Sequence, residues 1–107
     1  MAEEKILKQF TTGDGAGELT IRQRSTGRVE LDDFYVVSGR RGRGLGRLLL
    51  GRAVGYMRRH QLTVYLIVAP FDDSAMTVET LAGFYARYGF VRTKPNTESR
   101  EMVWLPK

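Results

Sequence analysis

Residues 34–49 read FYVVSGRRGRGLGRLL, and this stretch decides the fold because the hydrophobic period changes within it. Phe34 to Val37 are apolar and end a segment that is typical of a β-strand. A glycine- and arginine-rich loop follows. From Gly44 to about His60, apolar residues recur every three or four positions, which predicts an amphipathic helix. Strand, loop and helix in this order predict a right-handed crossover onto a parallel strand.

The segments on either side of this unit predict a small mixed sheet. Segments 5–10, 18–24 and 28–37 are separated by turns and predict an antiparallel meander. Segment 62–69 is nearly all apolar, as expected of a strand buried on both faces. A short helix, with Thr77 as its expected N-cap and Gly89 at its end, and strands at 90–93 and 100–105 complete the chain. We therefore predict one domain, 1–107, of the α/β (α+β) class, with a mixed, mostly antiparallel central sheet and two helices.

Composition narrows the function. The chain has 107 residues, no cysteine and a single histidine, His60, which excludes thiolate chemistry and predicts no metal site. The charged start and the lack of a run of ~20 apolar residues predict a cytoplasmic protein with no membrane partner. The net charge is +5, and no acidic residue occurs between Arg40 and Arg59. A polyphosphate, nucleic acid or another anion is therefore the expected partner of this segment.

The glycine-arginine loop suits a phosphate group. Glycines allow a close approach of the backbone, and the free N–H groups at a helix N-terminus attract anions. Gly46 is followed by Arg47 and Leu48, which does not fit a nucleotide-binding P-loop, and the third glycine of a dinucleotide fingerprint is missing. A solvated basic turn and a nucleic-acid patch are the alternatives to a phosphate loop.

Two motifs resemble one family. Arg41-x-x-Gly44-x-Gly46 is similar to the R/Q-x-x-G-x-G/A motif of the GNAT acetyltransferases, and LAGFYARYGF at 81–90 resembles their late helix. The resemblance implies that acetyl-CoA is the cosubstrate and lies between splayed strands 28–37 and 62–69. It also implies that the backbone of Phe34, Tyr35 and Val36 pairs with the pantetheine arm. The cofactor's pyrophosphate would then be held by the loop residues Arg41, Gly42, Arg43, Gly44, Leu45, Gly46 and Arg47.

The resemblance also implies catalytic residues. Tyr85, four residues before Gly89, has the place of the family's general acid. Glu30, eleven residues before Arg41, resembles the catalytic glutamate of the histone-acetylating branch, with Asp32 or a water chain as the alternative base. Asp72 and Asp73 are expected near the acceptor entrance, where they would attract a cationic amine or shape a turn.

The chain departs from the family in two places. Val78 stands where many members have an asparagine, and only about 27 residues precede the strand that leads into the loop. The usual N-terminal strand and helices are therefore expected to be absent, which leaves an open acceptor cleft unless a homodimer closes it. An open cleft favours a protein lysine as acceptor. The alternatives are a polyamine or aminoglycoside acceptor, or a degenerate module that binds nucleic acid or protein.

The abbreviated plan is also similar to that of small phage-encoded acetyltransferases, among them an anti-CRISPR enzyme. The likeness rests on the segment 69–74, on the pair Phe84-Tyr85 and on the terminal Met102-Val103-Trp104. It implies a phage or mobile-element origin.

Overall fold

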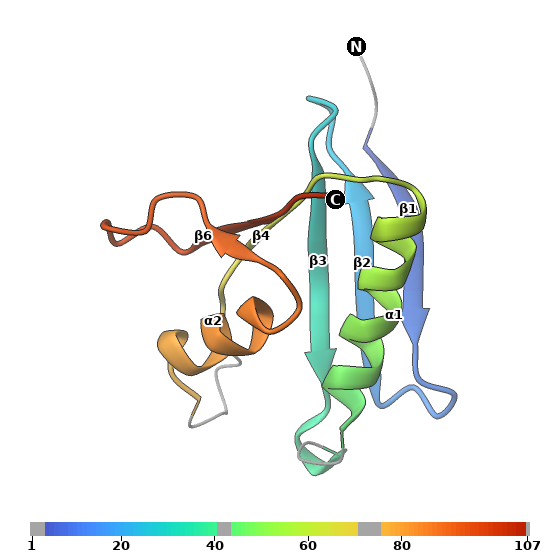
Figure 1. Ribbon diagram of the computed structural model, residues 1–107. Coiled ribbons are helices and arrows are strands. Elements are labelled where there is room, and N and C mark those ends of the chain that lie inside the picture. Colours follow the sequence, from blue (N-terminus) through green and yellow to red (C-terminus); the bar gives the residue numbers. More distant parts are fainter. Residues whose placement is uncertain (1–3, 41–43, 71–75, 107) are drawn as a thin grey trace.

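The computed structural model describes residues 4–40, 44–70 and 76–106. Its strands form one six-stranded sheet in the order β1-β2-β3-β4-β6-β5 (Figure 1). The strands are β1 (Lys5–Thr11), β2 (Gly17–Gln23), β3 (Val29–Val36), β4 (Val64–Ile67), β5 (Val91–Arg92) and β6 (Glu101–Trp104). The predicted antiparallel meander of β1, β2 and β3 is confirmed, and β3 and β4 make the single parallel pair of the described sheet.

Two α-helices connect the strands. Helix α1 (Leu45–Arg59) joins β3 to β4, and α2 (Val78–Ala86) joins β4 to β5. A short 3-10 helix, η1 (Ser38–Arg40), lies between β3 and the loop and was not predicted. Thr77 caps α2 as expected, since its hydroxyl accepts a hydrogen bond from the Thr80 N–H at 3.1 Å. Neither described helix has the length and apolar character that a membrane span requires.

Both helices pack on the same face of the sheet. Helix α1 buries a stripe of apolar side chains, Leu49, Leu50, Ala53, Val54 and Met57. These side chains share one core with residues of β2, β3, β4 and β6 and with Ala82 and Tyr85 of α2. Each fully buried leucine contributes about 1.5–3 kcal/mol to folding. The Tyr88 hydroxyl donates to the Arg47 carbonyl oxygen at 3.4 Å, which links the end of α2 to the start of α1.

The other face of the sheet carries no helix of the described chain. Segment 62–69 was expected to be buried on both faces, but only the face toward the helices is buried. Val64, Leu66 and Val68 are buried, whereas Ile67 is 61% exposed. The alternation arises because residues 65 and 67 point away from the two helices.

A bulge in β3 sets which side chains face the helices. Thr20 pairs with Asp32 and Glu18 with Tyr35, so β3 has one residue more than β2 between these pairs. Asp33 adopts φ 51°, the left-handed conformation that aspartate tolerates better than most residues. The bulge turns Phe34 toward the helices, next to Phe84 and Tyr85, and leaves Tyr35 on the helix-free face.

Candidate functional site

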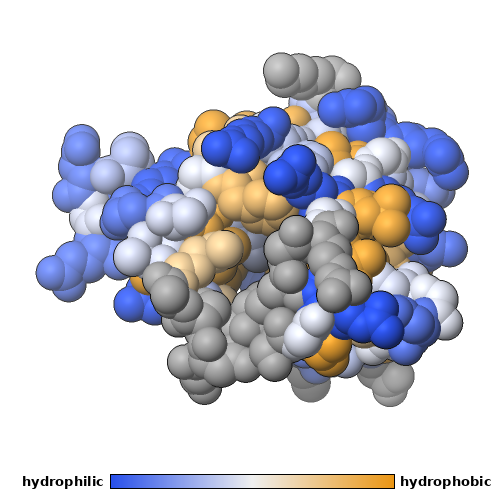
Figure 2. All heavy atoms as spheres, turned by 90° about the horizontal axis from the view of Figure 1, so that it is seen from below, coloured by the Kyte–Doolittle hydropathy of each residue, from blue (hydrophilic) through white to orange (hydrophobic). Residues whose placement is uncertain are grey.

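Strands β3 and β4 separate soon after they meet. They pair only at Val29–Val64 and Glu30–Tyr65, and in Figure 1 they then run apart. A cavity of about 290 Å³ lies where the two strands have diverged. Its lining comes from β3, η1, the start of α1, the end of the β4 segment and α2, namely Phe34, Val36, Arg40, Gly44, Leu45, Gly46, Arg47, Ala69, Pro70, Met76, Leu81, Phe84 and Tyr85. Figure 2 views this end of the molecule, where apolar side chains (orange) reach the surface among hydrophilic ones (blue).

The N-terminus of α1 forms one wall of the cavity. Gly44 precedes the helix at φ 80°, and as a glycine it has no side chain with which to cap the first turn. The N–H groups of residues 45–47 therefore have no acceptor within the helix, and the positive end of the helix dipole lies behind them. Arg40 and Arg47 add positive charge at the same wall. This arrangement is suited to a phosphate or diphosphate group.

Arg40 is held in place by the β1–β2 turn. Its guanidinium lies 2.8 Å from Asp14 Oδ2. The Thr12 hydroxyl donates to Asp14 Oδ1 at 2.8 Å, and the Ala16 N–H donates to the same oxygen. These two hydrogen bonds, with the charge of Arg40, hold the pKa of the Asp14 carboxyl below its usual value. Asp14 is therefore ionised at neutral pH and steadies Arg40.

Aromatic rings form a second part of the lining. Tyr85 is only 5% exposed, and its ring centroid lies 5.7–6.2 Å from those of Phe34, Phe84 and Phe90. Burial raises the pKa of the Tyr85 phenol well above its ordinary value near 10. The hydroxyl thus stays protonated at neutral pH, as a proton donor must.

Glu30 lies where β3 and β4 stop pairing, and it does not line the cavity. Its carboxylate accepts from Arg24 Nε at 2.8 Å and lies 3.2 Å from Arg28 Nε. Asp32 is on the same side of β3 and bonds the same Arg24 side chain at 2.6 Å. Glu30 and Asp32 thus share one face of β3, as residues two apart in a strand do. A proton from the cavity would need a water chain to reach either carboxylate.

The structure brings most of the predicted site together. Phe34, Val36, Gly44, Leu45, Gly46, Arg47 and Tyr85 line the one cavity. The Tyr35 side chain is 40% exposed and does not line the cavity. Arg41, Gly42, Arg43, Asp72 and Asp73 lie outside the described residues.

Sequence reasoning missed several lining residues. Arg40 and Met76 belong to no quoted motif, and Ala69, Pro70 and Phe84 lie in quoted segments but were given no role at a cavity. Only the position of Arg40 beside the glycine loop could have indicated a role. His60 stacks on Tyr56 at 4.3 Å, beyond the C-terminus of α1 and away from the cavity. Within residues 4–40, 44–70 and 76–106, no three His, Cys, Asp or Glu side chains gather as metal ligands would.

Comparison with known proteins agrees with this geometry. The model of the acetyltransferase (GNAT) family matches residues 13–90. No curated protein matches the chain.

Solved structures share the fold. The anti-CRISPR protein AcrVA5 superposes with a TM-score of 0.66 and 23% identity, over 92% of this chain and 99% of its own. A GNAT-family N-acetyltransferase (YhbS) from Escherichia coli, in complex with CoA, superposes with a TM-score of 0.60 and 20% identity, over 89% of this chain and 55% of its own. A GNAT-family acetyltransferase from Staphylococcus aureus superposes with a TM-score of 0.58 and 16% identity, over 91% of this chain and 65% of its own. The chain thus spans about half to two thirds of the length of these two bacterial proteins.

Proposed function

Because the chain belongs to the acetyltransferase (GNAT) family, we propose that it transfers the acetyl group of acetyl-CoA directly to a primary amine, and that this amine is a protein lysine. The single observation that carries the proposal is the cavity between the diverging strands. It has an anion-binding helix N-terminus on one side and a protonated tyrosine on the other.

The described residues fit acetyl-CoA. The first N–H groups of α1, with Arg40 and Arg47, would hold the diphosphate, and Arg41, Gly42 and Arg43 belong to the same proposed loop. Phe34 and Val36 would contact the pantetheine arm beyond the last β3–β4 pair, and the backbone of Tyr35 would pair with it. When bound, acetyl-CoA supplies an acetyl group that its thioester activates toward an amine.

The catalytic roles follow from position. The neutral amine attacks the thioester carbon, an N–C bond forms and the C–S bond breaks. Tyr85 gives its proton to the departing sulfur. The proton that the amine loses goes through water to Glu30, which lies at the end of the paired part of the two strands. Asp32, on the same face, is the alternative acceptor, and bulk water is a third.

A protein lysine is supported by the open side of the molecule. A small amine is usually enclosed by its enzyme, whereas the face that carries Glu30 has no helix of the described chain over it. The loop with Asp72 and Asp73, which lies outside the described residues, stays a predicted entrance for the acceptor. An origin in a phage or mobile element also stays a prediction.

Mass spectrometry of protein acceptors incubated with acetyl-CoA tests the function. We expect a gain of one acetyl group on lysine with the wild-type protein and none with Gly44→Glu, which places a carboxylate and a strained residue at the mouth of the diphosphate site. Gly51→Ala is the matched control, because residue 51 lies on the exposed side of the same helix. Absence of acetylation together with absence of acetyl-CoA binding would refute the proposal.

A further inference from the structure

The helix-free face of the sheet is charged along β2 and β3. Glu18, Arg22, Glu30 and Asp32 occupy the positions that alternate with buried Leu19, Ile21 and Leu31. On β6, Glu101 takes the corresponding place beside buried Met102. We call this surface the acidic face, since carboxylates outnumber cations on it. Five carboxylates contact three arginines there, namely Glu4, Glu30, Asp32, Asp33 and Glu101 around Arg22, Arg24 and Arg28, and Glu18 lies on the same face.

Each arginine of this face serves more than one carboxylate. Arg22 lies 3.4 Å from Asp32 and 2.8 Å from Asp33. Arg24 contacts Glu4, Glu30 and Asp32 at 2.6–3.1 Å. Hydrogen bonds from Arg28 and Thr93 lower the pKa of Glu101, and the charge of Lys94 at the margin of the face adds to this effect. The acidic face therefore keeps an excess of negative charge, although the whole chain carries +5.

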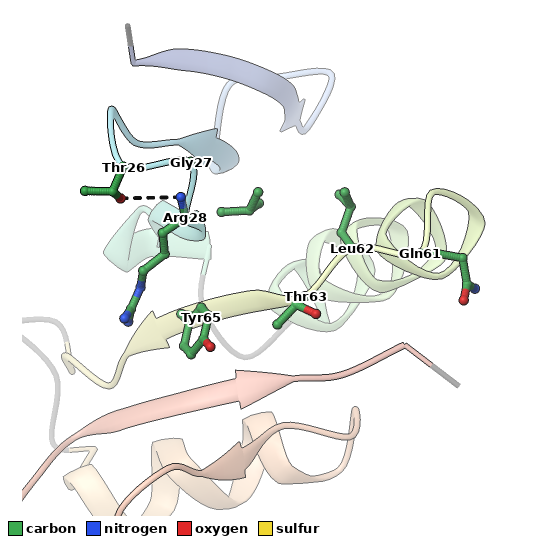
Figure 3. A pocket seen from close by; sticks show the side chains of 8 residues that line it. Thr26, Gly27, Arg28, Gln61, Leu62, Thr63 and Tyr65 are labelled. Carbon is green, nitrogen blue, oxygen red and sulfur yellow. Dashed lines mark hydrogen bonds between the residues drawn. The ribbon is translucent and has the colours of Figure 1, made fainter. Parts of the chain in front are cut away.

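The surroundings of Arg28 show that this face can hold a cationic group. Its guanidinium carbon lies 3.8 Å from the centroid of the Tyr65 ring, and its nitrogens contact Glu30 at 3.2 Å and Glu101. An aromatic ring between two carboxylates is a binding environment for a cation. Figure 3 shows Arg28 reaching toward Tyr65 at the side of an open groove of about 640 Å³, which Thr26, Leu62 and Thr63 also line.

This cation environment lies beside the last pair between β3 and β4. Glu30 and Tyr65 form the last pair between β3 and β4, and the two strands diverge beyond it. The cavity lined by Tyr85 lies farther along the diverging strands, next to Phe34 and Ala69, so the proposal below requires an acceptor side chain to extend from this face toward that end. Exposed apolar side chains lie on the strands beside Glu101, since Ile67 pairs with Glu101 and is 61% exposed, and Val91 pairs with Val103 and is 54% exposed.

We propose that the acidic face binds a basic polypeptide segment, so that the acceptor is a lysine flanked by further lysines or arginines. The inference rests on the proposed function and names its substrate class. The flanking cations lie against Asp32, Asp33 and Glu101, and the exposed apolar side chains contact the rest of the segment. A second copy of the chain fits the face less well, because a two-fold contact would set its excess carboxylates against themselves.

Binding of two labelled peptides, measured by fluorescence anisotropy, tests this proposal apart from catalysis. Each peptide has one central lysine, flanked by arginines in the first and by glutamates in the second. We expect the arginine peptide to bind about tenfold more tightly at low ionic strength, and the preference to shrink as salt is added. The same order is expected for kcat/KM in acetylation.

Matched variants locate the effect. Asp33→Asn keeps a residue that accepts the left-handed backbone and should weaken binding of the arginine peptide about two- to fivefold. Glu79→Gln on α2 removes a carboxylate that is 82% exposed on the helix side, and should leave binding unchanged. Equal binding of both peptides, a preference for glutamate, or a dimer that buries this face would overturn the inference. Failure of acetyl-CoA to bind would instead refute the proposed function.

Discussion

The phenol of Tyr85 is surrounded by the rings of Phe34, Phe84 and Phe90, which leaves the side chain 5% exposed. Phe34 reaches this cluster only because the bulge at Asp33 turns it toward the helices. The motif could predict that a tyrosine stands four residues before Gly89. It could not predict the Phe34 ring from β3, because the bulge leaves no pattern in the sequence.

Tyr85→Phe should lower kcat by about 10²-fold, at the lower end of the range for loss of a general acid. Binding of acetyl-CoA should change little, because only one hydroxyl is removed from an apolar wall. Initial rates with saturating acetyl-CoA check this. Tyr56→Phe is the control, since its hydroxyl bonds the Leu7 carbonyl oxygen away from the cavity. An unchanged kcat in Tyr85→Phe would remove Tyr85 from the role.

The same phenol predicts a loss of stability at high pH. In the unfolded chain Tyr85 ionises near pH 10, whereas burial raises its pKa in the folded protein. The free energy of unfolding is therefore unaffected by Tyr85 below pH 10. Above it, this free energy falls by about 1.4 kcal/mol per pH unit, because the unfolded state alone loses the proton. Urea unfolding of wild type and Tyr85→Phe at pH 9 and pH 11 should show this slope in the difference between the proteins. Identical slopes would contradict it.

At the scale of elements, the glycines of α1 have unequal roles. Gly44 needs its left-handed φ of 80°, and a Cβ on Gly46 would lie 3.7 Å from Phe34 and 3.9 Å from Phe84. Gly51 and Gly55 are both exposed, so neither allows α1 to pack closely on the sheet. A Cβ on Gly51 would meet only Tyr88 at 4.0 Å among described atoms, and one on Gly55 would meet nothing within 4 Å.

Gly51→Ala and Gly55→Ala should each raise the free energy of unfolding by roughly 1 kcal/mol, since alanine favours the helix and no described atom obstructs it. Thermal unfolding of each single variant is the measurement. Gly17→Ala is the opposite case, because its Cβ would lie 3.0 Å from Leu49 Cδ1 and 3.2 Å from the Tyr35 carbonyl oxygen. A destabilised Gly51→Ala protein would show that the helix approaches a neighbour more closely than the structure indicates.

The repeat of apolar residues along the sequence predicted the strands and helices well where one face of the element is buried. The order of strands and helices, the parallel crossover and the cap at Thr77 follow from local pattern and are confirmed. The spacing of apolar residues does not show over what length two strands stay paired. The separation of β3 and β4 after Glu30–Tyr65 could therefore be expected only from the family resemblance. The sequence pattern also left Gly17 in the turn before the second strand. Its close contact with Leu49 joins segments far apart in the sequence, and no local pattern could show such a contact.

On the scale of the whole molecule, charge is segregated. The loop and helix between Arg40 and Arg59 carry seven arginines and no carboxylate, whereas the acidic face gathers carboxylates around Arg22, Arg24 and Arg28. The two regions adjoin the same pair of diverging strands. An anionic cofactor and a cationic acceptor are thus each attracted to a different side of the molecule.

This segregation predicts that the diphosphate dominates cofactor binding. At 100 times its dissociation constant, acetyl-CoA should stabilise the fold by about 2.7 kcal/mol, a rise in Tm of roughly 10 °C. S-acetylpantetheine lacks the diphosphate and cannot use the N-terminus of α1, Arg40 or Arg47, so at equal concentration it should raise Tm far less. Added salt should reduce the difference between the two ligands, because it screens the charges at this exposed wall. Equal shifts in Tm for the two ligands at low salt would mean that the helix N-terminus does not bind the diphosphate. The cavity would then bind its ligand by apolar contacts alone.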